Sequence, residues 1–285
     1  MNDTRVCNSI TALMAGTMVP REGFLRVLSI HQRAVNLQRC DARTLVSLIS
    51  DARDMAPTAL LLNRLPGGLD RGAVARLDRS SLTIGGERIV EYGGARCWNG
   101  SLPRGSGYRL TPERVGALRR LVTLHGRHGG LLGLLHPQAC NPLSDFAHRK
   151  LAATVSATGA EADLSTLVGL GVGLTPSGDD FLVGAMLAEE LCDRCGAAHR
   201  RLDRGALQRR LPATTAAGET LLCSALEHQF PAYLIQLADR VFHWSADNTF
   251  PERRSMAYLF DHGQTSGTDS AVGAVWFLSN LAADT

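Results

Sequence analysis

The chain has 285 residues, of which 45% are hydrophobic and 20% are charged, and its formal net charge is +3. This composition is that of a globular protein with one large or two ordinary domains. The weak, unclustered positive charge argues against a nucleic-acid partner. No stretch reaches the roughly 18 successive apolar residues of a membrane span, so we expect no membrane partner and a cytoplasmic location.

The first hundred residues predict mostly strands. The first 20 carry a short apolar patch after Asp3, which we interpret as a helix or loop of the mature protein rather than a signal peptide. Residues 24–38 show alternating and β-branched character, and residues 57–66 hold a short apolar run. In residues 80–92, Gly85-Gly86 separates two short runs and predicts a hairpin.

A Gly/Pro/Ser-rich linker follows another short strand, and we place a domain boundary near residue 105. The remainder is helical in pattern, beginning with Thr111 as N-cap and Pro112 as first helical residue. Helices are predicted around residues 112–124, 144–158, 178–195, 199–211, 215–228, 231–243 and 266–282. The predicted fold class is therefore α+β, with a β-rich N-terminal domain (1–105) and a larger α-helical C-terminal domain (106–285).

Several classes of chemistry are disfavoured by residue types. Lys150 is the single lysine, so a Gly-Lys-Ser/Thr phosphate loop is absent. Cys192 and Cys195 form a C-x-x-C without a second pair, and we interpret them as reduced and structurally passive. No H-x-x-x-H or H-E-x-x-H occurs, which argues against a zinc hydrolase. We therefore expect no metal site of that kind.

Two helix starts share a pattern, S-G-x-D-x-x-V-G-A, at residues 177–185 and 266–274. One interpretation is structural: Ser177 with Asp180, and Ser266 with Asp269, form variants of the capping box. Thr175-Pro176 offers an alternative cap one turn earlier. Gly184 and Gly273 would then permit close approach of the two helices.

The other interpretation is a binding site. Both helices are apolar on nearly all sides and should be buried, so their polar starts would face the interior or a cleft. Helix N-termini bind anions, and the glycines of GLGVG let the backbone approach a ligand. The aspartates then contact either Mg²⁺ bridging to phosphate or the NH₂ of an amide or carbamoyl group. Asp179, which has no evident capping role, is the first choice.

These motifs, GLGVGLTPSGDDFLVG and HGQTSGTDSAVGA, resemble the AllH family, once described as a domain of unknown function or a carboxylase. Residues 211–222, LPATTAAGETLL, are similar to the family's intermediate Thr-Thr segment. The chain departs from the family at Val172, where proline is usual. The resemblance implies a subunit of an oxamate carbamoyltransferase of allantoin breakdown, which converts oxalurate and phosphate into oxamate and carbamoyl phosphate. It also implies other protein subunits as partners.

On this hypothesis the chain binds carbamoyl phosphate, oxamate or a similar small molecule, with no certain cofactor and Mg²⁺ as an option. The predicted catalytic residues are Asp179, Asp180 and His262, with His262 as proton donor or polarising group. The predicted substrate-binding residues are Gly171, Gly173, Thr175, Ser177, Gly178, Thr265, Ser266, Gly267 and Asp269. An arginine is expected for the substrate carboxylate.

Two alternatives remain open at the sequence level. The chain could be a non-catalytic scaffold or small-molecule-binding subunit that holds the same ligand. It could also be a metal-dependent carboxylase-like enzyme. It is not a biotin carrier, because Lys150 is not flanked by methionines.

Overall fold

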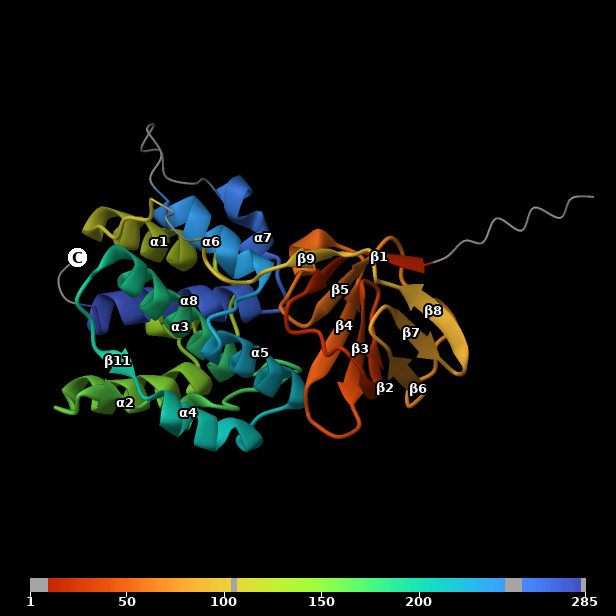
Figure 1. Cartoon of the computed structure of the whole chain (residues 1–285). Helices are drawn as coiled ribbons and strands as arrows, with labels where there is room; N and C mark the ends of the chain where they lie inside the picture. The colour runs from red at the N-terminus through yellow and green to blue at the C-terminus, as the bar shows by residue number, and fades with distance from the viewer. Residues whose placement is uncertain (1–9, 104–106, 244–252, 283–285) are drawn as a thin grey trace, which may run out of the picture. The chain divides into compact units, whose positions relative to one another are not determined.

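The computed structural model describes residues 10–103, 107–243 and 253–282 (Figure 1). Contacts between Cα atoms divide the chain into two compact units, residues 1–100 and 101–285. The first is built of strands and the second mainly of helices, which confirms the predicted fold class. The boundary expected near residue 105 falls at 104–106, outside the described residues.

The described part of the first unit forms a single mixed sheet. Its strands are β1 (Ile10–Gly16), β2 (Gly23–Ile30), β3 (Ala34–Arg39), β4 (Leu45–Ile49), β5 (Ala59–Leu62), β6 (Val74–Leu77), β7 (Ser81–Ile84), β8 (Glu87–Glu91) and β9 (Arg96–Trp98). The strand order is β5-β4-β3-β2-β6-β7-β8-β1-β9. Because β1 also pairs with β5, the sheet closes on itself, which removes most exposed strand edges.

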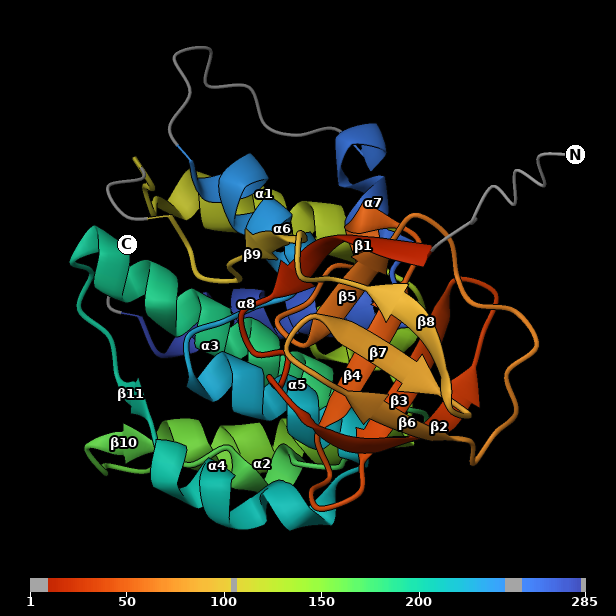
Figure 2. The same cartoon turned by 45° about the vertical axis from the view of Figure 1, so that its right-hand side comes forward.

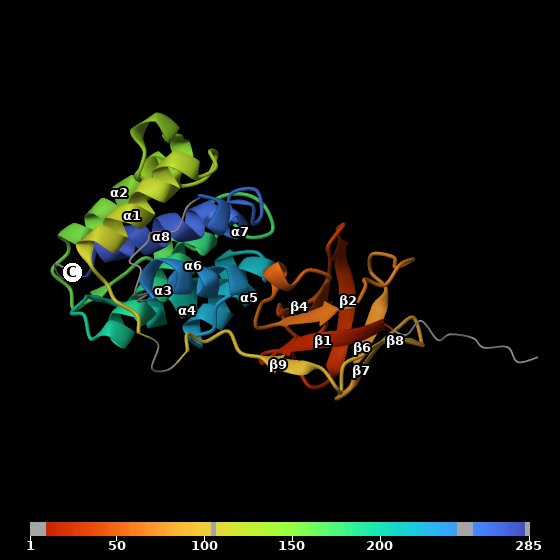
Figure 3. The same ribbon diagram turned by 90° about the horizontal axis from the view of Figure 1, so that it is seen from above.

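Alternation of side chains builds the interior of this sheet. In β2, Leu25 and Val27 are buried while Phe24, Arg26 and Leu28 are exposed, as the period of two requires. Inward-facing aliphatic side chains from β1 and from β3 to β8 join them in one apolar cluster. Figures 2 and 3 show the strands from two further directions, curving around this shared interior.

Two predictions for this unit have clear outcomes. The Gly85-Gly86 hairpin is confirmed: Ile84 pairs with Glu87 across the turn, and both glycines have positive φ, 62° and 90°. The helix or loop expected in the first 20 residues is wrong for residues 10–16, which form β1. The apolar side chains of Ile10 and Ala12 point into the closed sheet, and this tertiary burial overrides the weak local pattern.

The described part of the second unit contains eight α-helices. They are α1 (Pro112–His125), α2 (Pro142–Ser156), α3 (Ser177–Cys195), α4 (Arg204–Arg210), α5 (Ala216–Leu226), α6 (Ala232–Phe242), α7 (Ala257–Phe260) and α8 (Ser266–Asn280). A short parallel pair, β10 (Glu161–Ala162) and β11 (Arg201–Leu202), joins them. The 3-10 segments among the described residues of both units are η1 (Ala52–Asp54), η2 (Leu132–Leu134), η3 (Pro137–Ala139), η4 (Ser165–Leu167), η5 (Leu211–Ala213) and η6 (Arg253–Met256).

Helices α3 and α8 lie side by side at the centre of this unit (Figures 1 and 2). Every residue of α3 from Ser177 to Cys192 is buried, as is every residue of α8 from Gly267 to Leu278. Helix α1 packs against α8, whereas α5 and α6 pack against α3. The all-round burial predicted from their composition is therefore confirmed, and it places the two motif-bearing helix starts in the interior.

The predicted helix boundaries hold in some places and fail in others. Thr111 caps α1 by accepting from the Arg114 N–H, with Pro112 at the first position, as expected. The helix predicted over residues 199–211 is wrong in its first part: Arg201–Leu202 form β11, and α4 starts only after Asp203. The backbone of this segment pairs with β10, and a residue in an extended strand cannot also be helical. Helix α7 was not predicted.

None of the helices in the described ranges combines the length and apolar character needed to cross a bilayer.

Candidate functional site at the starts of α3 and α8

The closest approach of α3 and α8 depends on two glycines in equivalent positions. A Cβ on Gly184 would lie 1.8 Å from the Ser270 carbonyl oxygen, and one on Gly273 would lie 1.9 Å from the Phe181 oxygen. A main-chain carbonyl of the other helix thus packs directly against each glycine, and no side chain could be accommodated there. The close packing predicted for these glycines is confirmed, and it is reciprocal.

The hydroxyl groups at the two helix starts point across to the partner helix. Ser177 and Ser266 are the first helical residues, and neither α3 nor α8 has a side-chain cap. The predicted capping boxes are therefore wrong. Instead, Ser266 interacts with Asp180 and Ser177 interacts with Asp269, each hydroxyl lowering the pKa of the opposite carboxyl. The two contacts are equivalent, because in each the serine of one motif meets the aspartate of the other.

Thr175 completes the contact between the two motifs. Its Oγ1 lies 3.1 Å from Oγ of Ser266, although the two residues are 91 positions apart in the chain. Both side chains are partly buried, whereas Ser177 is almost fully buried. Thr265 lies beside Asp269 in the same way as Thr175 lies beside Asp180, since each threonine lowers the pKa of its carboxyl by hydrogen bonding.

Asp180 and Asp269 are the buried carboxyls of this junction, with exposed fractions of 1% and 0%. Burial raises the pKa of Asp269 to about 6, opposed by a hydrogen bond of 2.6 Å from the Leu131 N–H to its Oδ1. Burial, and then the charge of Asp269, raise the pKa of Asp180 well above its usual value. No hydrogen-bond donor in the described part of the chain reaches Oδ2 of either residue.

Asp179 uses both of its oxygens to hold neighbouring segments. Oδ1 accepts from the Gly169 N–H at 2.8 Å, and Oδ2 accepts from the Thr214 hydroxyl. Burial raises the pKa of this carboxyl, and the two hydrogen bonds oppose the rise. Asp179 therefore ties the glycine-rich loop before α3 to the Thr-Thr segment before α5, and its direct contact with a ligand stays a prediction.

Thr268, at the equivalent position of α8, holds a second glycine-rich segment. Its hydroxyl accepts from the Arg127 N–H at 2.9 Å. The Arg127 guanidinium contacts Asp261 at 3.0 Å and the Gly263 carbonyl oxygen at 3.5 Å. This segment was not predicted to belong to the site. Its signal in the sequence is the HGRHGG run at residues 125–130, which begins at the last residue of α1 and consists of glycines and basic residues.

The loop before α3 depends on glycine for its shape. Gly169, Gly171 and Gly173 have φ values of 75°, 116° and 107°, which L side chains rarely adopt. Between them Val172 is 91% exposed, so the loop presents its tip to solvent. The conformational role of these glycines is thus clear, and contact of Gly171 and Gly173 with a ligand stays a prediction.

The glycines inside the helix starts have their N–H groups engaged within the chain. Gly178 donates to the Leu170 carbonyl oxygen at 2.8 Å, and Gly267 donates to that of His262 at 3.2 Å. A Cβ on either glycine would collide with a carbonyl oxygen of the preceding segment. These two N–H groups are therefore not available to an anion in this conformation.

His262 stacks on Tyr233, which the sequence analysis did not single out. The ring centroids are 4.0 Å apart and the planes are inclined by 21°. The Tyr233 hydroxyl lies 3.0 Å from Oγ of Ser270, and burial with the nearby charges of Asp180 and Asp269 raises its pKa. The stack fixes the orientation of the His262 imidazole against Tyr233.

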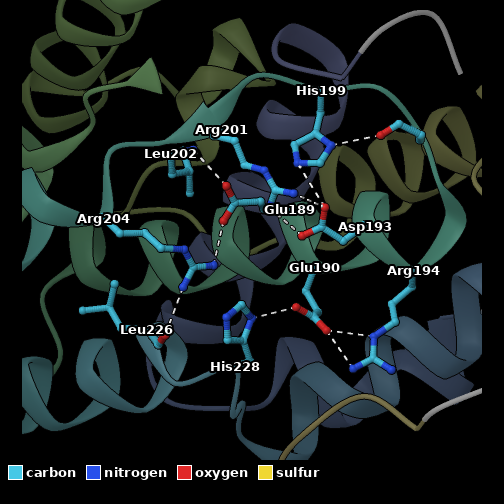
Figure 4. A network of polar contacts seen from close by, with 11 residues as sticks. Glu189, Glu190, Asp193, Arg194, His199, Arg201, Leu202, Arg204, Leu226 and His228 are labelled. Carbon is cyan, nitrogen blue, oxygen red and sulfur yellow. Dashed lines mark hydrogen bonds and ion pairs between the residues drawn. The ribbon is translucent and has the colours of Figure 1, made fainter. Parts of the chain in front are cut away.

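A different polar network occupies the other end of α3 (Figure 4). Buried Glu189 accepts from the Leu202 N–H and from the Arg204 guanidinium, both at 2.8 Å. Glu190 accepts from His228 at 2.7 Å, and Arg194 also binds it at 2.8 Å. Asp193 forms two bonds of 2.7 Å with Arg201.

Each carboxylate of this network has a cationic or N–H partner, so the network attaches α3 to β11, to α4 and to the segment after α5. The neighbouring C-x-x-C belongs to the same packing. Cys192 is buried, which raises the pKa of its thiol to about 12, and the Cys195 thiol lies 3.4 Å from the Tyr108 carbonyl oxygen. Both cysteines are free thiols.

No cluster of three or more His, Cys, Asp or Glu side chains suitable for a metal ion occurs among the described residues. Asp180 and Asp269 are only two carboxyls, so a cation site built from them and from neutral hydroxyl oxygens would fall outside this class of cluster.

Fold and site together define a helical domain whose two central helices pack through glycines and place paired carboxyls at their starts. Residues 167–278 match the family model of the oxamate carbamoyltransferase subunit AllH. This segment contains both motifs and the Thr-Thr segment, so the resemblance to the AllH family is confirmed there. The family is named for a subunit of a transferase. No solved structure shows significant similarity to the chain.

Proposed function

We propose that this chain is a subunit of a carbamoyltransferase that converts oxalurate and phosphate into oxamate and carbamoyl phosphate. The proposal includes allantoin breakdown as the pathway, a cytoplasmic location and activity only in a complex with other subunits. The family match supports the class of enzyme. The meeting of the two motifs supports the location of the substrate site.

The observation that carries the proposal is the contact between Thr175 and Ser266. Two hydroxyl groups from distant parts of the chain lie 3.1 Å apart, partly buried, at the start of two buried helices. A pair of hydroxyls can donate to one oxygen and accept from one NH₂ group, which are the two polar features of a carbamoyl group. The loop with Val172 at its tip would cover such a ligand.

The chemistry requires positioning more than an activated nucleophile. A phosphate oxygen attacks the ureido carbonyl carbon, and the carbonyl oxygen gains negative charge. The bond from that carbon to the nitrogen of oxamate then breaks, and the nitrogen takes the proton that phosphate releases. On this proposal the hydroxyls of Thr175 and Ser266 stabilise the carbonyl oxygen, and His262 carries the proton to the leaving nitrogen.

Arg127 is our choice for the carboxylate of the substrate. Its guanidinium lies beside Gly263, in the segment that leads into α8, and its side chain is 44% exposed. A guanidinium binds a carboxylate through two parallel hydrogen bonds. Asp179 acts as a positioning residue, because it holds the glycine loop and Thr214 through hydrogen bonds.

The test is a reconstituted assay of carbamoyl phosphate formation from oxalurate and phosphate, with the chain alone and with its partner subunits. The Thr175→Val/Ser266→Ala double variant keeps side-chain volume nearly unchanged and removes both hydroxyls. We expect turnover of the mixture to fall about 100-fold, the usual effect of losing a donor to a developing oxyanion. Assembly, measured by light scattering, should not change.

The matched control is Thr83→Val in β7, which removes a hydroxyl from the other unit and should leave turnover unchanged. Normal turnover of the double variant would contradict the proposed site. Normal turnover in mixtures containing Asp179→Asn and Asp180→Asn as well would instead identify the chain as a scaffold subunit.

A further inference from the structure

Two carboxyls share the junction of α3 and α8 without a cationic side chain. Asp180 and Asp269 are essentially sealed from solvent, and neither takes part in any ion pair formed by the described residues. Glu189, on the same helix α3, is equally buried but is neutralised by Arg204 at 2.8 Å. An uncompensated buried charge costs several kcal/mol, so the Asp180–Asp269 pair is neutralised either by bound protons or by a positive partner of another kind.

The helix N-termini do not provide enough compensation. A helix dipole stabilises a carboxylate in its first turn by about 0.3–1 kcal/mol, and up to about 2 kcal/mol where partly buried. This is less than the desolvation cost of each carboxylate. The Leu131 N–H reaches only Oδ1 of Asp269, and Oδ2 of both residues has no donor in the described part of the chain.

The side chains that hydrogen-bond to the two carboxyls carry hydroxyl oxygens. The hydroxyls of Thr175 and Ser266 lie at Asp180, and those of Ser177 and Thr265 lie at Asp269. Carboxylate and hydroxyl oxygens are ligands for hard cations such as Mg²⁺, which binds them at about 2.0–2.1 Å. Because the orphan oxygens are sealed from solvent, an amide of a substrate cannot reach them in this conformation, whereas a small ion needs less room.

We propose that Asp180 and Asp269, with the hydroxyls of Thr175, Ser177, Thr265 and Ser266, bind one hard divalent cation of the Mg²⁺ class. The two positive charges of the cation balance the two negative charges of the carboxylates. The bound cation would connect the start of α3 to the start of α8. This inference stands on the geometry of the helix starts and does not depend on the proposed reaction.

The experiment uses the full chain, freed of metals with EDTA and dialysed at pH 7.5. Thermal unfolding is followed during titration with MgCl₂, CaCl₂ or MnCl₂, with KCl added to keep the ionic strength constant. We expect a saturable rise in the unfolding temperature. Loss of the free Mn²⁺ signal in electron paramagnetic resonance should give one tight site per chain, with Mg²⁺ competing for it.

Substitutions locate the site. Asp180→Asn and Asp269→Asn should weaken the apparent divalent affinity at least about 100-fold, since each removes a charged ligand. Asp193→Asn is the matched control on the same helix, because Asp193 is paired with Arg201 at the other end. It should leave the affinity unchanged. If the Asn variants do not fold, Ser177→Ala and Thr265→Val should still weaken the affinity about tenfold.

Three results would overturn the inference. The first is an unfolding temperature that divalent cations do not change, which would mean that a proton neutralises the pair. The second is equal stabilisation by KCl alone. The third is unchanged affinity in both Asn variants, or in both hydroxyl variants, which would place the divalent ion elsewhere or show adventitious binding.

Discussion

At the scale of single residues, the acidic side chains at the starts of α3 and α8 have two different roles. Asp179 accepts two hydrogen bonds and positions a loop, whereas Asp180 and Asp269 each have one oxygen that lacks a donor in the described part of the chain. The difference comes from one step along the helix, which rotates the side chain by about 100°. Neighbouring aspartates in a sequence therefore need not share a site.

The Asp269 carboxyl predicts a pH dependence of stability in buffer without divalent cations. Its pKa is raised from 3.8 to about 6, so the folded state binds this proton more tightly than the unfolded chain does. The stabilisation is fully present below pH 3.8 and is lost as pH rises through about 6. We expect a loss of about 2–3 kcal/mol between pH 4 and pH 7, because the folded and unfolded pKa values differ by about two units and each unit corresponds to about 1.36 kcal/mol.

The measurement is the free energy of unfolding in urea at pH 4.5, 5.5, 6.5 and 7.5, for the wild type and Asp269→Asn. The variant keeps an oxygen to accept from Leu131 and lacks the titration, so the difference between the two proteins should change with pH. A difference that stays constant over this range would show that Asp269 does not titrate there. Added Mg²⁺ should reduce the loss at pH 7.5, because the cation replaces the proton.

At the scale of elements, α3 and α8 form a nearly symmetric pair. Each begins with a serine, meets a carbonyl oxygen of its partner at its eighth residue, a glycine, and holds a glycine-rich segment with its third residue. This relation explains the repeated sequence pattern as a packing requirement shared by both helices. The reciprocal contacts mean that a shift of one helix moves the carboxyl of the other.

Substitution of the two packing glycines tests this interface. Gly184→Ala and Gly273→Ala would each place a Cβ less than 2 Å from a main-chain oxygen, so the helices must separate. We expect each to lower the free energy of unfolding by about 1–3 kcal/mol or more, the usual cost of overpacking. Chemical denaturation measures the effect.

Gly116→Ala in α1 is the control. Its Cβ would meet only the end of the Arg120 side chain at 3.4 Å. Because alanine is the better helix former by about 1 kcal/mol, this variant should be unchanged or more stable. Equal stability of all three variants and the wild type would mean that α3 and α8 are not packed through Gly184 and Gly273.

At the scale of the whole molecule, the described residues form two separate hydrophobic cores. All members of the strand core lie between Ile10 and Val90, and all members of the helix core lie between Leu102 and Leu281. The candidate site and the matched family segment belong to the second unit alone. A unit with its own core has the means to fold independently.

We therefore expect a fragment of residues 101–285 to fold without the first unit. Its circular dichroism should be strongly helical, and its unfolding in urea should be a single cooperative transition. The fragment should also keep the divalent site with the affinity of the full chain. A fragment that is soluble but unfolds without a cooperative transition would show that the helical unit needs the strand unit for its stability.

The sequence by itself determined the order of strands before helices, most helix positions and the two motif-bearing helix starts. Local signals are sufficient for these, such as Thr111-Pro112 before α1, Gly85-Gly86 in the hairpin and the all-round apolar character of α3. They were not sufficient for β1 or β11, since both depend on pairing with distant strands.

Only the tertiary structure decided the partners of the polar residues. A sequence pattern of Ser and Asp three positions apart is compatible with a capping box within one helix. The close packing through Gly184 and Gly273 brings each serine instead to the aspartate of the other helix. Likewise Tyr233 and Arg127 join the site because α6 and the segment after α1 pack beside it. Such contacts follow from how helices are arranged in space, which local spacing does not contain.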